Sequence, residues 1–306
     1  MKDKRHYAGI DIGSNAVRLL IKCLNDEESE ELLSKVQLVR VPIRLGKDAF
    51  TKGRIGKKKS KKLVALMQAY QSLMEIYDVV DYRACATSAM RDASNGQELV
   101  EQIEEATGIK IEIISGPEEA ELISSDLIDD KEFARNDAFL YVDVGGGSTE
   151  LNLVQGGELR CSKSFDIGTI RQLSGKVEAK ELAAFCSYLQ EVKTQHPEIQ
   201  VVGSGGNINK LLRLGAPSER GKLNFLPYSS LRSVYSELSK YNNEERMIRF
   251  RLKPDRADVI IPASEIFLQV GDILGCEGIL VPTKGLSDGI VESVHRRYSL
   301  TNDTSI

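Results

Sequence analysis

Two acidic, glycine-rich turns, each preceded by a short apolar run, constrain the fold of this chain more than any other feature. The first is Asp11-Ile12-Gly13-Ser14-Asn15, and the second is Asp143-Val144-Gly145-Gly146-Gly147-Ser148-Thr149-Glu150. Glycine has no Cβ, so the backbone can approach an anion closely and turn its N–H groups towards it. An aspartate at such a turn can hold a cation or a water against the same phosphates. The doubled turn therefore predicts a phosphate clamp made in two parts.

The separation of the two turns indicates two domains. Asp11 and Asp143 are 132 positions apart in a chain of 306 residues, and a domain commonly contains about 100–200 residues. We place the domains at residues 1–124 and 125–306, and leave open whether the final helix, about 287–299, packs back on the first domain. A phosphate held by both turns would lie in an interdomain cleft, where ligand pockets are often found.

The composition is that of a soluble globular protein, with 41% hydrophobic and 28% charged residues. There is no apolar leader before the first strand and no uncharged run of membrane length, so we expect a cytoplasmic protein without membrane contact. The net charge of −4 argues against a general nucleic-acid binder. The five cysteines include no C-x-x-C pair, which indicates small buried side chains instead of a disulfide framework or a zinc site.

Strands and helices alternate in both halves, as in an α/β protein. The strand–turn–strand pattern around Asp11 begins again at Ala138, and Gly156-Gly157 predicts a hairpin. The expected strands are 7–12, 17–23, one or two within 32–45, 82–87, 110–114, 149–155, 158–165, 199–203 and 278–281. Six helices are expected at 60–80, 178–195, 229–240, 244–252, 255–274 and 287–298. Another is expected to begin at Asn95, which with Glu98 forms an N-cap pair, and to end at Gly108. Two more are expected to begin within 115–119 and within 204–207.

Two groups of basic residues stand out in an otherwise acidic chain. The denser is Lys52-Gly53-Arg54-Ile55-Gly56-Lys57-Lys58-Lys59-Ser60-Lys61-Lys62. A solvated loop and helix start is the commoner explanation of such a run, and an electrostatic guide for a long polyanion is the functional one. The second group, Arg249, Arg251, Lys253 and Arg256, is interpreted as a solvated face.

Eight motifs, in order and spacing, resemble the exopolyphosphatase and guanosine pentaphosphate phosphatase (Ppx/GppA) family. They occupy residues 9–19, 86–93, 114–120, 142–151, 166–171, 203–206, 256–260 and 285–289. Each glycine motif is weak alone, but their ordered combination over nearly the whole chain is specific. The resemblance implies the actin, hexokinase and Hsp70-like (ASKHA) architecture of two ribonuclease-H-like domains with an interdomain cleft. Longer relatives add a helical domain of HD type, so the chain resembles the short, two-domain form.

The resemblance implies hydrolysis of a terminal phosphoanhydride with Mg²⁺ or another divalent cation. Such chemistry requires neutralised charge, in-line geometry and an oriented water. By resemblance, Glu119 orients and deprotonates the water and Glu150 is the second essential carboxylate. Asp143 and Glu150 are expected to share the Mg²⁺, with Asp11 close by. The expected phosphate-binding residues are Gly13, Ser14, Asn15, Arg18, Arg91, Gly145, Gly146, Gly147, Ser148, Ser204, Gly205 and Gly206.

Simpler explanations exist for several of these residues. A glutamate in the first turn of a helix favours that helix whether or not it is catalytic, and this would suffice for one of Glu118 and Glu119. Surface ion pairs explain Arg18 and Arg91 about as well as phosphate binding does.

The substrate stays open between inorganic polyphosphate and guanosine pentaphosphate. An ATP-dependent small-molecule kinase has the same fold, and a non-catalytic sensor of guanosine polyphosphates is a further alternative. Glu121 and Ser287 stand where relatives often carry basic residues. At both positions this chain therefore has less positive charge than those relatives. A homodimer is an expectation from the family alone.

Overall fold

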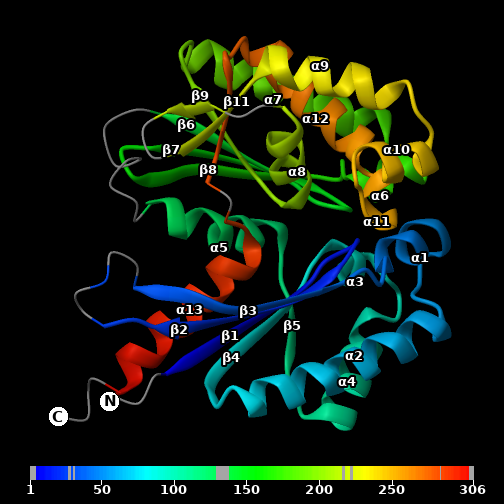
Figure 1. Ribbon diagram of the computed structural model, residues 1–306, viewed down its shortest axis with the longest axis vertical. Helices are drawn as coiled ribbons and strands as arrows, with labels where there is room; N and C mark the ends of the chain where they lie inside the picture. The colour runs from blue at the N-terminus through cyan, green and yellow to red at the C-terminus, as the bar shows by residue number, and fades with distance from the viewer. Residues whose placement is uncertain are drawn as a thin grey trace. The chain divides into compact units, whose positions relative to one another are not determined.

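The computed structural model describes residues 5–26, 29, 32–128, 138–215, 218–220, 223–282 and 284–302 (Figure 1). The chain divides into two compact units. The first comprises Met1–Asp126 with Leu286–Ile306, and the second comprises Leu127–Gly285. The last helix is therefore part of the first unit, the option that the sequence left open. None of the helices in the described ranges is long and apolar enough to span a membrane.

The sheet of the first unit has the strand order β3-β2-β1-β4-β5. Strands β1, β2 and β3 pair antiparallel, while β4 runs parallel to β1 and β5 runs parallel to β4. The strands are β1 (His6–Ile12), β2 (Val17–Leu24), β3 (Leu33–Val41), β4 (Val79–Ala86) and β5 (Ile111–Ile113). The first turn of the sequence connects the two central antiparallel strands, β1 and β2.

The helices of the first unit are α1 (Leu45–Lys52), α2 (Lys57–Ile76), α3 (Ser88–Asp92), α4 (Gly96–Thr107), α5 (Gly116–Ile128) and α13 (Leu286–Asn302). The C-terminal helix α13 packs on β1, β2 and β4 (Figure 1). It buries Val291 and Val294 against Tyr7 and Leu20. Tyr70 of α2 donates to the carbonyl oxygens of Val17 and Val39. The core of the first unit thus combines the first strands of the sequence with the helix α13.

The second unit repeats the strand order of the first. Its sheet is β10-β11-β12-β9-β6-β7-β8, in which β8-β7-β6-β9-β12 corresponds to β3-β2-β1-β4-β5, with the same antiparallel and parallel pairings. Strands β10 and β11 extend it at one edge. The bounds are β6 (Phe139–Val144), β7 (Thr149–Gln155), β8 (Glu158–Phe165), β9 (Gln200–Ser204), β10 (Ser218–Arg220), β11 (Leu223–Pro227) and β12 (Gly278–Val281). The prediction of two α/β domains of ribonuclease-H type is confirmed.

A nearly apolar helix, α12, lies at the centre of the helical part of this unit. It packs on α6, α7, α8 and α9, and its Phe267 belongs to the same buried core as Phe185 of α7. The helices are α6 (Thr169–Leu173), α7 (Ala179–Gln195), α8 (Gly206–Leu214), α9 (Tyr228–Ser239), α10 (Asn243–Arg249), α11 (Pro254–Ala257) and α12 (Ile260–Leu274).

The stretch 32–45 contains one of the one or two strands expected there. This strand, β3, ends at Val41, and α1 begins at Leu45 after Arg44 turns into the left-handed region with φ 59°. One predicted element was wrong in length. The helix predicted at 255–274 is two helices, α11 and α12. Pro262 explains the break, since a proline cannot donate the hydrogen bond that a continuous helix needs there.

Two boundaries in the first unit also differ from the sequence prediction. The helix predicted at 60–80 spans 57–76 as α2, and residues 79–86 form β4. Asn95 does not cap α4 with its side chain. Instead, that side chain accepts from the N–H of Ile55 at 2.8 Å and donates to its carbonyl oxygen at 3.0 Å. The two Asn95 bonds tie the turn before α2 to the start of α4. Of the cysteines, Cys23 and Cys85 are buried as expected, whereas Cys161, Cys186 and Cys276 are partly exposed.

Candidate active site

The first glycine turn is held by its neighbours in the first unit. Gly13 donates to the carbonyl oxygen of Ala16 at 3.2 Å, which closes the turn between β1 and β2. The carbonyl of Ser14 accepts from the N–H of Gly46 at 2.9 Å, and the Ser14 hydroxyl lies 2.8 Å from that of Ser88 at the start of α3. The start of α1 and the start of α3 therefore fix the backbone of this turn.

Asp11 and Arg18 face each other across β1 and β2. They are paired in the strand register, and their side chains form an ion pair. Asp11 is only 3% exposed, so its charge is balanced inside the unit by Arg18. Burial, and then the charge of Asp11, raise the pKa of the nearby Tyr70 hydroxyl. The structure shows the ion pair of Arg18, and phosphate binding by Arg18 stays a prediction.

The two glutamates at the start of α5 have different surroundings. The Glu118 side chain is 40% exposed and pairs with Arg83 at 2.6 Å, while its N–H is capped by the Ser115 hydroxyl at 3.2 Å. The Glu119 side chain is 9% exposed. Glu118 thus performs the ordinary helix-start and ion-pair roles, and these do not account for the burial of Glu119.

Arg91 connects α3 to Glu119. One guanidinium nitrogen donates to the carbonyl oxygen of Ile114 at 2.7 Å, and the same nitrogen lies 3.8 Å from Glu119 Oε2. The guanidinium group of Arg91 and the N-terminus of α5 thus both place positive charge beside the buried Glu119 carboxyl group.

The second glycine turn is shaped by α6. The carbonyl oxygen of Gly145 accepts from the N–H of Thr169 at 3.0 Å, and that of Gly146 accepts from the N–H of Ile170 at 2.8 Å. The guanidinium Nε of Arg171 donates to the carbonyl oxygen of Gly147 at 2.7 Å. The carbonyl groups of three successive glycines are thus held on the side of α6.

The N–H groups of this turn are not used in the same way. Among the residues that the structure describes, no backbone carbonyl accepts a hydrogen bond from the N–H of Gly146, Gly147 or Ser148. Successive N–H groups in a turn of this kind form a concave site for an anion. The geometry of residues 145–148 therefore suits phosphoryl oxygens.

Asp143 and Glu150 lie at the two ends of this turn. They are directly opposite each other in the antiparallel pairing of β6 and β7, so both side chains project from the same face of the sheet. Asp143 accepts from the Ser204 hydroxyl at 2.5 Å, and Glu150, which is fully buried, accepts from the Ser164 hydroxyl at 3.0 Å. The described residues contain no group of three or more His, Cys, Asp or Glu side chains suited to a metal ion.

The third predicted segment, Ser204-Gly205-Gly206, lies next to Asp143. Gly205 has a φ of 94°, and a Cβ there would come within 3.0 Å of Asp143 Oδ1. A Cβ on Gly206 would come within 2.0 Å of the Arg256 guanidinium, which also donates to the Asn207 side chain at 2.7 Å. Arg256 therefore lies over the start of α8, and its interpretation as part of a solvated face was wrong.

The structure collects the predicted residues into two groups. In the first unit they are Asp11, Gly13, Ser14, Asn15, Arg18, Arg91 and Glu119. In the second unit they are Asp143, Gly145, Gly146, Gly147, Ser148, Glu150, Ser204, Gly205 and Gly206. Sequence reasoning missed the support that Arg171 gives to the second turn. The glycine just before α6 was a signal for it, because a Cβ on Gly168 would lie 2.4 Å from the backbone of Gly147.

Comparison with known proteins gives consistent matches along the chain. Residues 26–297 match the model of the Ppx/GppA phosphatase family. The chain is 27% identical to exopolyphosphatase 2 of Mycobacterium tuberculosis, covering 94% of this chain and 98% of that protein. It is 25% identical to the bifunctional 3-dehydroquinate synthase/phosphatase of Fusobacterium nucleatum, covering 95% of this chain and 47% of that protein.

Two further matches also cover nearly the whole of this chain. The chain is 23% identical to the guanosine-5'-triphosphate,3'-diphosphate pyrophosphatase of Aeromonas hydrophila, covering 93% of this chain and 58% of that protein. Some curated relatives are thus about twice the length of the segment that matches. The crystal structure of the Aquifex aeolicus Ppx/GppA family member is 26% identical, with a TM-score of 0.75 and coverage of 98% of this chain and 99% of that one.

Proposed function

The chain belongs to the Ppx/GppA phosphatase family, and from that premise we propose that it is an exopolyphosphatase, which hydrolyses the terminal phosphoanhydride of inorganic polyphosphate and releases orthophosphate. The observation that carries the proposal is the buried Glu119 carboxylate beside Arg91 in the first turn of α5. A carboxylate in such a place can orient the attacking water and accept its proton. The similarity to an exopolyphosphatase over 98% of that protein's length supports the choice of substrate.

Each group has a role in this reaction. The N–H groups of residues 146–148 hold phosphoryl oxygens. The water oxygen forms a bond to the terminal phosphorus while the bridging P–O bond breaks, and the shortened chain leaves with the bridging oxygen. Glu119 accepts a proton from the attacking water. The ion pair with Arg91 keeps the Glu119 side chain in place.

Mg²⁺ fits the carboxylates of the second unit. This ion is usually bound through one or two carboxylates together with substrate phosphates and waters. Asp143 and Glu150 project from the same face of the sheet and would hold it. Asp11 is the weaker candidate, because Arg18 already balances its charge. When bound, the ion would neutralise charge on the phosphates.

A panel of substrates tests the proposal. Purified protein with Mg²⁺ is incubated separately with long polyphosphate, tripolyphosphate, guanosine pentaphosphate, and ATP with sugars, and released orthophosphate is measured. We expect release from polyphosphate at the highest kcat/KM. Preferential release from guanosine pentaphosphate would assign the alternative phosphohydrolase activity. If phosphate is released from none of them and guanosine tetraphosphate binds tightly, the enzyme assignment is wrong and the sensor assignment is favoured.

The role of Glu119 is tested by replacing Glu119 with Gln. We expect kcat to fall by about 10²–10⁴-fold, because the amide cannot accept the proton, while KM changes little. The matched control is Glu118→Gln, which removes the same charge one residue earlier from an exposed position. Its kcat should remain near that of the unmodified protein. Near-normal turnover in Glu119→Gln would remove Glu119 from the mechanism.

A further inference from the structure

The first unit carries a dense group of exposed positive charges on α1, on α2 and in the turn between them. We call Lys47, Lys52, Arg54, Lys57, Lys58, Lys61 and Lys62 the basic segment. All seven side chains belong to exposed residues. Residues 44–62 contain a single acidic residue, Asp48. The whole chain has a net charge of −4, so this concentration is local.

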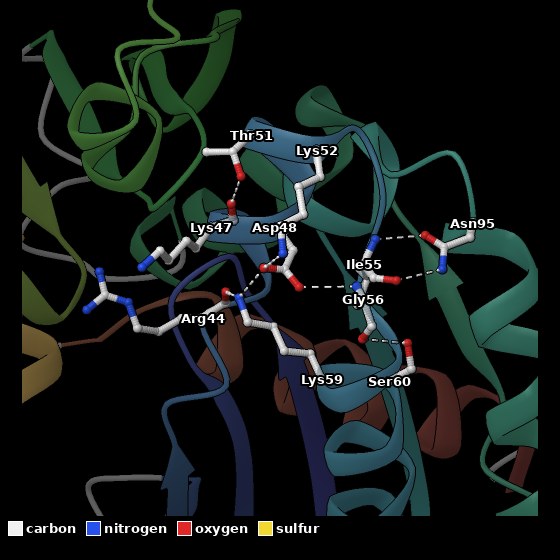
Figure 2. Close-up of polar contacts among 10 residues, drawn as sticks. All are labelled: Arg44, Lys47, Asp48, Thr51, Lys52, Ile55, Gly56, Lys59, Ser60 and Asn95. Atoms are coloured by element: carbon white, nitrogen blue, oxygen red, sulfur yellow. Dashed lines mark hydrogen bonds and ion pairs between the residues drawn. The ribbon is translucent and has the colours of Figure 1, made fainter.

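The charge of Asp48 is already committed to an internal partner (Figure 2). Asp48 is buried, lies 3.2 Å from Lys59 Nζ, and accepts from the N–H of Gly56 at 3.1 Å. Burial acts to raise the pKa of Asp48, but the bonds from Lys59 and Gly56 outweigh it, and the pKa is lowered overall. Lys59 is the lysine of the run that turns inward, with its side chain 19% exposed. Asp48 and Lys59 therefore form an internal pair.

The exposed residues of the basic segment differ from Lys59 in their pairing with acidic side chains. Lys52 lies 3.4 Å from Asp48, but the other six members of the basic segment form no ion pair within the described part of the chain. Figure 2 shows Lys47 pointing away from Asp48. The positive charge of the segment is thus available to an external anion.

The position of these lysines is unfavourable for α2 itself. The first turn of α2 contains no acidic residue, although a helix N-terminus favours negative charge. Lys57 with Lys61, and Lys58 with Lys62, are like-charged pairs at i,i+4 spacing, and such pairs destabilise a helix. The lysines therefore do not stabilise α2, and binding of an external anion is the role that their arrangement favours.

Hydrogen bonds of Arg44 and Lys59 connect the start of α2, which carries four residues of the basic segment, to the first glycine turn. The carbonyl oxygen of Asn15 accepts from the N–H of Arg44 at 2.9 Å, and the carbonyl oxygen of Arg44 accepts from Lys59 Nζ at the start of α2. Arg44 has a left-handed backbone, with a φ of 59°, which is strained in a non-glycine residue. This chain of contacts holds the start of α2 in a fixed position relative to residues 13–15.

We propose that the basic segment binds the non-reacting part of a long inorganic polyphosphate chain. The inference rests on the proposed function and adds a subsite to it. Lysine ammonium groups on flexible stems suit a linear polyanion without a fixed conformation. The segment also lacks an exposed ring, since Phe50 is the aromatic residue within 44–62 and it is buried. A nucleobase would find no aromatic face to stack on, which favours polyphosphate over nucleic acid.

The test is the combined variant Lys57→Gln, Lys58→Gln, Lys61→Gln and Lys62→Gln. We expect KM for long polyphosphate to rise at least about tenfold, with weaker dependence on salt concentration, because fewer cations are displaced on binding. Both kcat and the KM for tripolyphosphate should stay unchanged. The melting temperature should not fall, because unfavourable charge is removed from the helix start.

The matched control removes four exposed lysines elsewhere, by Lys35→Gln, Lys110→Gln, Lys180→Gln and Lys240→Gln. It changes the net charge equally and should leave the long-chain KM unaltered. An unchanged long-chain KM in the α2 variant, or an equal rise in the control, overturns the proposed subsite. Competition against labelled long polyphosphate gives a further test. If single-stranded RNA competes as effectively per phosphate as unlabelled polyphosphate does, the proposed subsite is also overturned.

Failure of the proposed function gives a different result. If the unmodified protein releases no orthophosphate from any polyphosphate, then binding of labelled long polyphosphate is measured directly in the absence of turnover. Tight binding that is lost in the α2 variant supports the subsite independently of catalysis. No binding by the unmodified protein overturns it.

Discussion

Glu118 and Glu119 are neighbours in the sequence, but their side chains serve different purposes. Glu118 is partly exposed and pairs with Arg83, and Glu119 is buried beside Arg91. Both residues satisfy the preference for acidic residues at a helix start. The sequence pattern alone therefore cannot choose between them, and the family resemblance points to Glu119. Burial adds an independent physical reason for that assignment.

Two glycines near α6 illustrate different reasons for having no side chain. Gly168 has a φ of −144°, which any residue can adopt, but a Cβ there would lie 2.4 Å from the backbone of Gly147. Gly175 has a φ of +63° and open space around it. Gly168 is thus required by close approach to the second glycine turn, and Gly175 by its backbone conformation.

This contrast predicts the effects of two alanine substitutions. Gly168→Ala should displace residues 145–148 and lower kcat/KM for polyphosphate at least tenfold, because the turn that binds phosphate must move. Gly175→Ala should cost about 1–2 kcal/mol of stability through backbone strain, and turnover should be retained. Thermal unfolding and steady-state phosphate release measure both effects. Equal activity in the two variants would show that the turn tolerates the displacement.

At the scale of secondary structure, the α1–α2 connection shows how one helix start is held. Five lysines occupy positions 57–62, and the sequence does not distinguish among them. Lys59 is the one that faces Asp48 and the carbonyl oxygen of Arg44. It is therefore a structural residue, whereas its four neighbours form part of the basic segment.

Replacing Asp48 with Asn should destabilise the protein by about 1–3 kcal/mol at pH 7, because Lys59 loses its charged partner in a partly buried position. The folded-state pKa of Asp48 is lowered, so its stabilising contribution is present above the ordinary pKa of 3.8 and is lost as the pH falls further. The stability difference between the two proteins should therefore be constant down to about pH 5 and shrink below about pH 4.

Denaturant unfolding at several pH values measures that difference. The control is Glu75→Gln at an exposed position near the other end of α2, which should change stability by no more than about 0.5 kcal/mol. A pH-independent loss in Asp48→Asn would mean that the effect arises from packing and not from the charge of the carboxylate.

At the scale of the whole molecule, the two units share one strand order, and the first unit is completed by the C-terminal helix. Val291 and Val294 of α13 are fully buried against Tyr7 and Leu20, which belong to the first strands of the chain. Lys22 of β2 also lies 3.0 Å from Asp288 of α13. The last helix is thus needed to close the core of the first unit.

Val294→Asp should therefore unfold the first unit selectively. Burying a carboxylate among apolar side chains costs several kcal/mol, a large part of a typical stability of about 5–15 kcal/mol. Hydrogen exchange should show lost protection in β1 and β2 and retained protection in β9 and α12. The control is Leu300→Asp at an exposed position of the same helix, which should leave exchange unchanged. Loss of protection throughout the chain would instead show that the two units unfold together.

The sequence by itself determined the α/β class, the repeated strand–turn–strand unit and the family, because these depend on local periodicity, turn residues and ordered motifs. Strands β7, β8 and β12 were predicted at their observed bounds, since Gly156-Gly157 and the apolar runs define them locally. Only the tertiary structure decided which of two adjacent glutamates is buried, which lysine is internal, and where Arg18, Arg171 and Arg256 lie. Those outcomes depend on contacts between residues far apart in the chain, and local patterns do not specify such contacts.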